Sequence, residues 1–225
     1  MNGWIIFGVF ALLSWLISMQ LRSKFKQYSG IPVNYGFTGK EVAEKMLADH
    51  GIYDVKVQSV EGELTDHYNP MQKTVNLSRV VYSSNSVAAA AVAAHECGHA
   101  VQHAKAYAWL TMRSSLVPAV SFASKWVQWV LLAGIVLLNT FPQLLLIGIV
   151  LFAMTTVFSF ITLPVEINAS TRALAWLTQA GITSYSTFPK AKSALKWAAY
   201  TYVVAAIGSL GALVYYIMIY LGSRD

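Results

Sequence analysis

Four apolar stretches, separated by polar segments, organise the chain and predict helices that cross a membrane. A helix needs about 20 predominantly apolar residues to span a hydrocarbon core of roughly 30 Å. The expected spans are residues 4–19, 126–141, 144–163 and 198–221. Asn139 and Pro142 predict a turn that joins the second span to the third. The chain is therefore expected to be a single, mainly α, polytopic membrane domain.

The polar segment after the first span predicts a small α+β unit. Thr38 and Glu41 have the spacing of a helix capping box, and Gly51 stands where the glycine that ends a helix is expected. The residue pattern after this helix predicts three strands, at residues 55–60, 63–68 and 73–77. The last two strands are joined by a turn and form a hairpin. We interpret the third strand as a sheet edge, where an extended substrate could pair with the backbone around Val75.

A second, longer helix is expected over residues 87–102, because serine and asparagine residues suited to an N-cap precede it at 83–86. It carries the pattern H-E-x-x-H as His95, Glu96 and His99. Residues four apart lie on one face of a helix, so the two imidazoles can bind a single Zn²⁺ ion. Glu96 lies beside them and is the expected general base for a metal-bound water. The alternative is a pair of helix-surface histidines that binds no metal.

A catalytic zinc needs a third protein ligand and an open position for water. Glu166 follows the third predicted span and is the preferred third ligand, since two histidines and one glutamate form a known catalytic zinc set. The alternative is an acidic residue at a helix N-terminus, favoured by the helix dipole, and the nearby Pro164 supports that interpretation. His103 shares the helical face of His95, but eight residues separate them by about 12 Å, so one ion cannot contact both.

The composition and the distribution of charge fit a membrane protein. Hydrophobic residues make up 56% of the 225 and charged residues 12%, against about 25% charged in typical soluble chains. Of the 16 Lys and Arg residues, all except Arg224 lie in the two segments that the spans place on one side, residues 21–125 and 164–196. The positive-inside rule places these segments in the cytoplasm and both termini outside. This asymmetry accounts for the net charge of +6 without a nucleic-acid partner.

The residues of the H-E-x-x-H helix and of the segment around Glu166 resemble one known group. The sequence from His95 to Gln102 reads H-E-x-G-H-A-x-Q, and the sequence from Leu163 to Ala173 reads L-P-V-E-x-x-A-S-x-R-A. Together with L-T-D-H-Y at residues 64–68, these motifs resemble the bacterial YugP-type membrane zinc metallopeptidases over nearly the whole chain. The chain is more distantly similar to the HtpX and CAAX-prenyl-protease group of gluzincin-like enzymes.

The resemblance implies one zinc ion, with His95, His99 and Glu166 as ligands and Glu96 as general base. It also implies a gluzincin-like unit in a multi-pass protein of the bacterial cell membrane. The catalytic segments are expected at about 22–115 and 164–196, on the side that the distribution of basic residues assigns to the cytoplasm. The chain departs from the pattern at Ser170, where the relatives carry an aspartate that is expected to bond to a zinc histidine. Ser170 can accept such a hydrogen bond but brings no charge.

The leading functional hypothesis is a membrane-bound zinc endopeptidase that hydrolyses peptide bonds of a peptide or membrane protein at the cytoplasmic face. Arg172 and His67 are the candidates for stabilising the oxyanion. The alternative is a catalytically inactive membrane scaffold or adaptor that contains zinc. A channel or transporter is disfavoured because no charge interrupts the spans 144–163 and 198–221.

Overall fold

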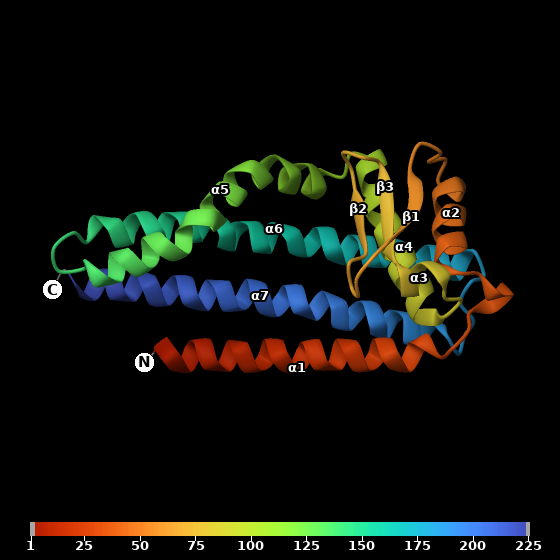
Figure 1. Ribbon diagram of the computed structural model, residues 1–225, viewed down its shortest axis with the longest axis horizontal. Helices are drawn as coiled ribbons and strands as arrows, with labels where there is room; N and C mark the ends of the chain where they lie inside the picture. The colour runs from red at the N-terminus through yellow and green to blue at the C-terminus, as the bar shows by residue number, and fades with distance from the viewer. Residues whose placement is uncertain (1–2, 224–225) are drawn as a thin grey trace. The chain divides into compact units, whose positions relative to one another are not determined.

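The structure is a computed structural model that describes residues 3–223, and it is mainly helical with one small sheet (Figure 1). The helices in this part of the chain are α1 (Gly3–Ser29), α2 (Gly39–Asp49), α3 (Arg79–Ser83), α4 (Val87–Ala104), α5 (Ala108–Val136), α6 (Gln143–Gln179) and α7 (Phe188–Gly222), with the short 3₁₀ helix η1 (Asn34–Gly36). The strands are β1 (Lys56–Val60), β2 (His67–Asn69) and β3 (Thr74–Ser78). The chain forms two compact units.

One unit contains the apolar helical segments, namely the described residues of Met1–Leu16, Thr111–Leu163 and Thr201–Asp225. Among the described residues, α5, α6 and α7 are long and apolar enough to cross a membrane. The first predicted span lies in α1, which is not one of these three helices. The count of four spans therefore stays a prediction. Arg224, the single basic residue expected on the outer side, lies outside the described residues.

The turn between α5 and α6 is confirmed, and the two helices pack closely beside it. Helix α5 ends at Val136, five residues before the predicted end of the second span, and residues 137–140 form turns. A side chain at Gly134 would place its Cβ 2.6 Å from the Cα of Leu145. Leu131, Leu145 and Ile149 form a small buried cluster there. The absence of a side chain at Gly134 therefore permits this helical hairpin.

The other unit consists of Ile17–Leu110 and Pro164–Tyr200. The capping box that opens α2 is confirmed, since the side chain of Thr38 accepts a hydrogen bond from the backbone N–H of Glu41 and the carboxylate of Glu41 accepts one from the backbone of Thr38. Gly51 has a φ of 71°, as expected for the residue that ends a helix. Val42 and Met46 on α2 are fully buried in a core that α4 and the sheet share.

The sheet corrects the prediction for the third strand. Its order is β1-β3-β2, with β3 parallel to β1 and antiparallel to β2 (Figure 1). Val75 is fully buried and pairs with Val57 on one side and Tyr68 on the other, so β3 is the central strand and offers no edge to a substrate. The predicted strand at 63–68 is also wrong in its start: β2 begins at His67, because Leu64 has a φ of 57° that interrupts extended backbone.

Candidate metal centre

Helix α4 places two histidines on one face, within the unit formed by Ile17–Leu110 and Pro164–Tyr200. The helix begins as predicted, with the side chain of Ser86 accepting a hydrogen bond from the backbone N–H of Ala89. Its alanines are almost all buried, which allows neighbouring elements to pack closely around it. The rings of His95 and His99 lie 4.8 Å apart, centroid to centroid, in an edge-to-face arrangement. Both side chains are largely buried, with 14% and 11% of their surface exposed.

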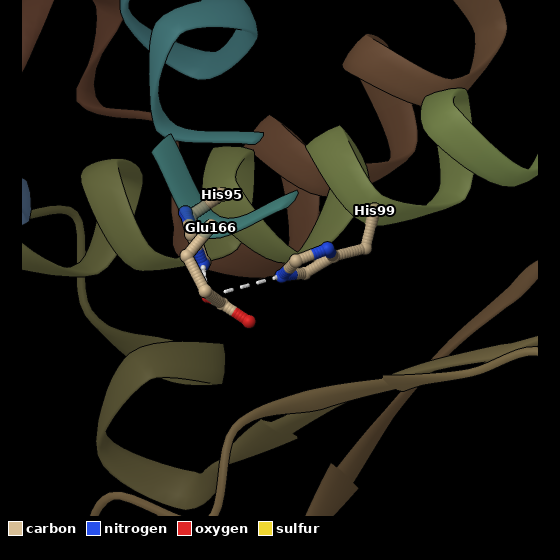
Figure 2. A group of neighbouring side chains, drawn as sticks. All are labelled: His95, His99 and Glu166. Carbon is tan, nitrogen blue, oxygen red and sulfur yellow. Dashed lines mark ion pairs between the residues drawn. The ribbon is translucent and has the colours of Figure 1, made fainter. Parts of the chain in front are cut away.

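Helix α6 brings Glu166 to this histidine pair. A Cβ at Gly98 would lie 2.6 Å from the carbonyl oxygen of Ala169, so only glycine lets α4 and α6 approach this closely. Figure 2 shows His95 and His99 projecting from α4 towards Glu166, which projects from α6. The Oε2 atom of Glu166 lies 3.3 Å from Nε2 of His95 and 3.6 Å from Nε2 of His99.

The alternative interpretation of Glu166 as an acid at a helix N-terminus is wrong. Helix α6 is continuous from Gln143 to Gln179, so Glu166 lies well inside it and far from the terminal N–H groups that carry the positive end of the dipole. Pro164 is also inside the helix rather than at its start. The position of Glu166 beside the histidines is therefore set by packing between helices and not by capping.

The three donors fit a zinc ion. Ligands at about 2.0–2.1 Å around a tetrahedral metal lie roughly 3.3–3.4 Å from one another, close to the two separations measured from Glu166. One ligand atom from each of His95, His99 and Glu166 can be chosen so that all three lie within 4.8 Å of one another. Two imidazole nitrogens and one carboxylate oxygen are the donor types that zinc prefers.

The negative charges around His99 raise the pKa of its imidazole above the usual value. Burial alone would lower this pKa, but the nearby carboxylates of Glu166 and Glu96 outweigh it. The carboxylate of Glu166 therefore favours the protonated imidazole of His99 over the neutral one. Because a zinc ligand must be deprotonated at the donor atom, binding of the metal is expected to release a proton from this site.

The predicted general base, Glu96, is held by the sheet. Its Oε2 atom accepts a hydrogen bond of 2.9 Å from the backbone N–H of Tyr68 on the edge strand β2. The Glu96 residue is 8% exposed. The position of β2 is in turn fixed by Asp66, whose carboxylate accepts hydrogen bonds from the backbone N–H and the hydroxyl of Ser78. Burial raises the pKa of Asp66 above its usual value despite these bonds.

The other residues that the sequence singled out have defined surroundings. The hydroxyl of Ser170 lies 3.1 Å from Nδ1 of His95, where the relatives are expected to carry an aspartate. His103 is hydrogen bonded to the hydroxyl of Tyr68 over 2.9 Å. Arg172 donates a hydrogen bond to Oδ1 of Asn168 and lies over the ring of Tyr107.

His67 lies on the opposite face of β2 from the Tyr68 side chain, because neighbouring residues of a strand point to opposite faces. Its ring forms hydrogen bonds with the backbone carbonyl of Thr65 and with the side-chain amide of Asn76 on β3. The side chain of Tyr68, by contrast, reaches His103 on α4. The structure thus brings Tyr68, rather than His67, to the helix that carries the histidine pair.

Sequence reasoning included Gln102 in the H-E-x-G-H-A-x-Q motif without giving it a role, and it missed Asn168. Gln102 is fully buried and contacts His99 as well as two groups of α6, one of which is Asn168. A signal for Gln102 was present, because it lies three residues after His99 and so on the same side of the helix. Asn168 gave no comparable signal, since 66 residues separate it from Gln102 along the chain.

Comparisons with known proteins identify the family of the chain. A family model described as "Putative neutral zinc metallopeptidase" matches residues 3–221. A protein of Bacillus subtilis (strain 168) described as "Putative membrane protease YugP" is 40% identical over 213 residues, which cover 95% of this chain and 94% of that protein. No solved structure matches the chain. The predicted resemblance to the YugP-type group is confirmed, and the chain belongs to the neutral zinc metallopeptidase family that this model describes.

Proposed function

We propose that the protein is a membrane-bound, zinc-dependent endopeptidase in which His95, His99 and Glu166 hold one Zn²⁺ ion and Glu96 is the general base. The observation that carries the proposal is the meeting of three donor atoms from two helices at distances suited to zinc. Membership of the metallopeptidase family and the identity to a membrane protease support it.

The chemistry follows from the positions of the protein groups. Zinc, when bound, supplies a Lewis acid that acidifies a water molecule and polarises the carbonyl of the scissile bond. Glu96 is next to His95 in sequence and accepts a hydrogen bond from Tyr68, so its carboxylate is held while it removes a proton from the attacking water. The same carboxyl group then delivers the proton to the departing amine. The burial of Glu96 and Glu166 limits competition from bulk water for these contacts.

Purified protein in detergent provides the direct test. We expect about one zinc ion per chain and cleavage of a denatured or unstructured protein substrate, with cleavage lost on chelation and regained when zinc is added back. Zinc without any cleavage would contradict the enzymatic proposal and favour the alternative of a zinc-containing scaffold or adaptor. Absence of bound zinc from protein refolded or purified with the metal present would contradict both.

The centre is proposed to face the cytoplasm of a bacterial cell. Basic residues are concentrated in the segments that carry the centre, and such residues are retained on the cytoplasmic side of membrane proteins. A protease-sensitive tag on the C-terminus tests this orientation. Cleavage of the tag by a protease added to intact spheroplasts supports it, and protection of the tag until lysis contradicts it.

The backbone N–H of Tyr68 is expected to contribute to catalysis by orienting Glu96. This N–H points to Glu96 and not into the ladder with β3, so proline at position 68 removes this bond while leaving the sheet paired. Tyr68→Pro is expected to lower kcat by roughly 10–100-fold relative to Tyr68→Ala, since a hydrogen bond to a charged group is worth about 1.5–3 kcal/mol. Both variants lose the ring and the hydroxyl, so their difference isolates the N–H. Equal kcat values at saturating zinc would show that this bond does not position the base.

A further inference from the structure

Gln102 is fully buried and has a defined partner at both ends of its amide. Its Oε1 atom lies 3.1 Å from Nδ1 of His99, and its Nε2 atom donates hydrogen bonds to the backbone carbonyl of Val165 over 2.8 Å and to Oδ1 of Asn168 over 3.0 Å. His99 and Gln102 belong to α4, whereas Val165 and Asn168 belong to α6. Gln102 thus connects His99, one proposed metal ligand, to α6, the helix that carries the proposed ligand Glu166.

The polarity of this hydrogen-bond chain is fixed from its far end. A guanidinium group can only donate, and Nε of Arg172 donates over 2.7 Å to Oδ1 of Asn168. That atom must therefore be the carbonyl oxygen of the Asn168 amide. A backbone carbonyl can only accept, so the groups of Asn168 and Val165 that face Gln102 are both acceptors. The NH₂ group of Gln102 must consequently face α6.

This orientation leaves the carbonyl oxygen of Gln102 facing His99. A carbonyl oxygen cannot donate, so the proton of the shared hydrogen bond must lie on Nδ1 of His99. Nε2 is the nitrogen that faces Glu166, 3.6 Å from its Oε2 atom. The series of hydrogen bonds from Arg172 through Asn168 and Gln102 therefore selects one tautomer of the His99 imidazole. In that tautomer Nε2 can supply a lone pair to a metal.

We propose that Gln102 is a positioning residue that sets the tautomer and ring orientation of His99 for zinc, with Asn168 and Arg172 fixing the orientation of its amide. This inference rests on the proposed zinc centre and assigns the residues that prepare one of its ligands. At His95 the corresponding partner is Ser170, whose hydroxyl can either donate or accept and so does not set the tautomer.

The test compares two substitutions at position 102 in the full-length protein in detergent. Gln102→Leu removes all three hydrogen bonds, and Gln102→Glu keeps an acceptor for His99 but replaces the NH₂ group. We expect Gln102→Leu to weaken zinc binding by about 10–100-fold, the usual effect of losing the hydrogen-bond partner of a metal-binding histidine. We expect Gln102→Glu to bind zinc at least as tightly as wild type, because a carboxylate is a stronger acceptor. The measurements are the zinc dissociation constant, from competition with a chelator, and the absorption spectrum of the Co²⁺-loaded protein.

Metal-free stability separates positioning from simple packing. Gln102→Glu places an acceptor-only group opposite the Val165 carbonyl and Asn168, so the metal-free variant is expected to unfold at a lower temperature than wild type while keeping its zinc affinity. If Gln102 contributed only to packing, both Gln102→Glu and Gln102→Leu would be less stable than wild type. Their zinc dissociation constants and the spectra of their Co²⁺-loaded forms would be unchanged. That result would overturn the inference and leave the proposed function intact.

Asn168 provides an independent variant that does not alter α4. Asn168→Asp keeps an acceptor for both Gln102 and Arg172 and is expected to bind zinc as wild type does, whereas Asn168→Leu is expected to weaken binding. Equal zinc dissociation constants for these two variants would contradict the proposed role of the hydrogen bonds from Arg172 through Asn168 to Gln102. This holds even if Gln102→Leu fails to fold. A wild-type protein that binds no zinc would refute the proposed function itself, which makes the two failures distinguishable.

Discussion

Replacing Glu166 by alanine is expected to lower the zinc affinity by about 10²–10³-fold and to abolish cleavage at ordinary zinc concentrations. Structural zinc sites with four ligands bind with about 10–16 kcal/mol, so one ligand contributes roughly 2.5–4 kcal/mol. Glu166 supplies the one oxygen donor of the proposed set, and its Oε2 atom lies within 3.6 Å of both histidine nitrogens. The measurement is metal content after dialysis, together with a dissociation constant from competition with a chelator.

Glu63→Ala is a matched control for this experiment, because Glu63 is an exposed acid that lies between β1 and β2. It should keep the zinc content and activity of wild type. Zinc content in Glu166→Ala equal to that in Glu63→Ala would contradict the ligand set proposed here. The metal would then have to be held without the residue that joins α6 to the histidine pair.

Glu96→Gln is expected to keep zinc and to lower kcat by roughly 10²–10⁴-fold, the range over which a positioned general base contributes. The amide oxygen of glutamine can still accept the hydrogen bond from the Tyr68 N–H, so the local structure should persist. The amide cannot take a proton from water at neutral pH, which removes the chemical step alone. The measurements are kcat at saturating zinc and the zinc content of the same preparation.

Glu44→Gln, an exposed substitution of the same type on α2, serves as its control and should leave kcat unchanged. Cleavage by Glu96→Gln at the wild-type rate would exclude Glu96 as the base. Loss of zinc and of folded structure together would instead assign Glu96 a structural role. Wild type and Glu96→Gln that are equally inactive but equally loaded with zinc would favour the scaffold alternative.

Signals that act over a few residues were read correctly from the sequence. The capping box of Thr38 and Glu41 concerns a helix end, and α2 begins directly after Thr38 as predicted. The sequence placed the N-cap of the next long helix within residues 83–86, and the structure assigns it to Ser86. The spacing of His95 and His99 places both rings on one side of α4 for the same reason. These features depend on helical geometry alone, which is the same in every protein.

Features that depend on pairing between distant segments could not be obtained in this way. The pattern of residues 73–77 indicates a strand but does not say whether it has one neighbour or two, and the structure gives β3 a partner on each side. The hydrogen bond from the Tyr68 N–H to Glu96 connects a strand to a helix 28 residues later, and the backbone carries no residue-type signal for it. Donor chemistry alone favoured Glu166 as the third ligand, but residue spacing does not show its approach to the histidines, because that depends on how α6 packs against Gly98.

The proposed donors come from two helices that are far apart in sequence, α4 and α6. A metal ion held by both would act as a removable crosslink, so the melting temperature of the protein should follow the supply of free zinc. For a ligand that binds only the folded state, the gain is about 2.7 kcal/mol when the free concentration is roughly 100 times the dissociation constant. Zinc scarcity would then reduce the lifetime of the folded chain as well as its activity, and would leave the starved protein exposed to degradation by other proteases.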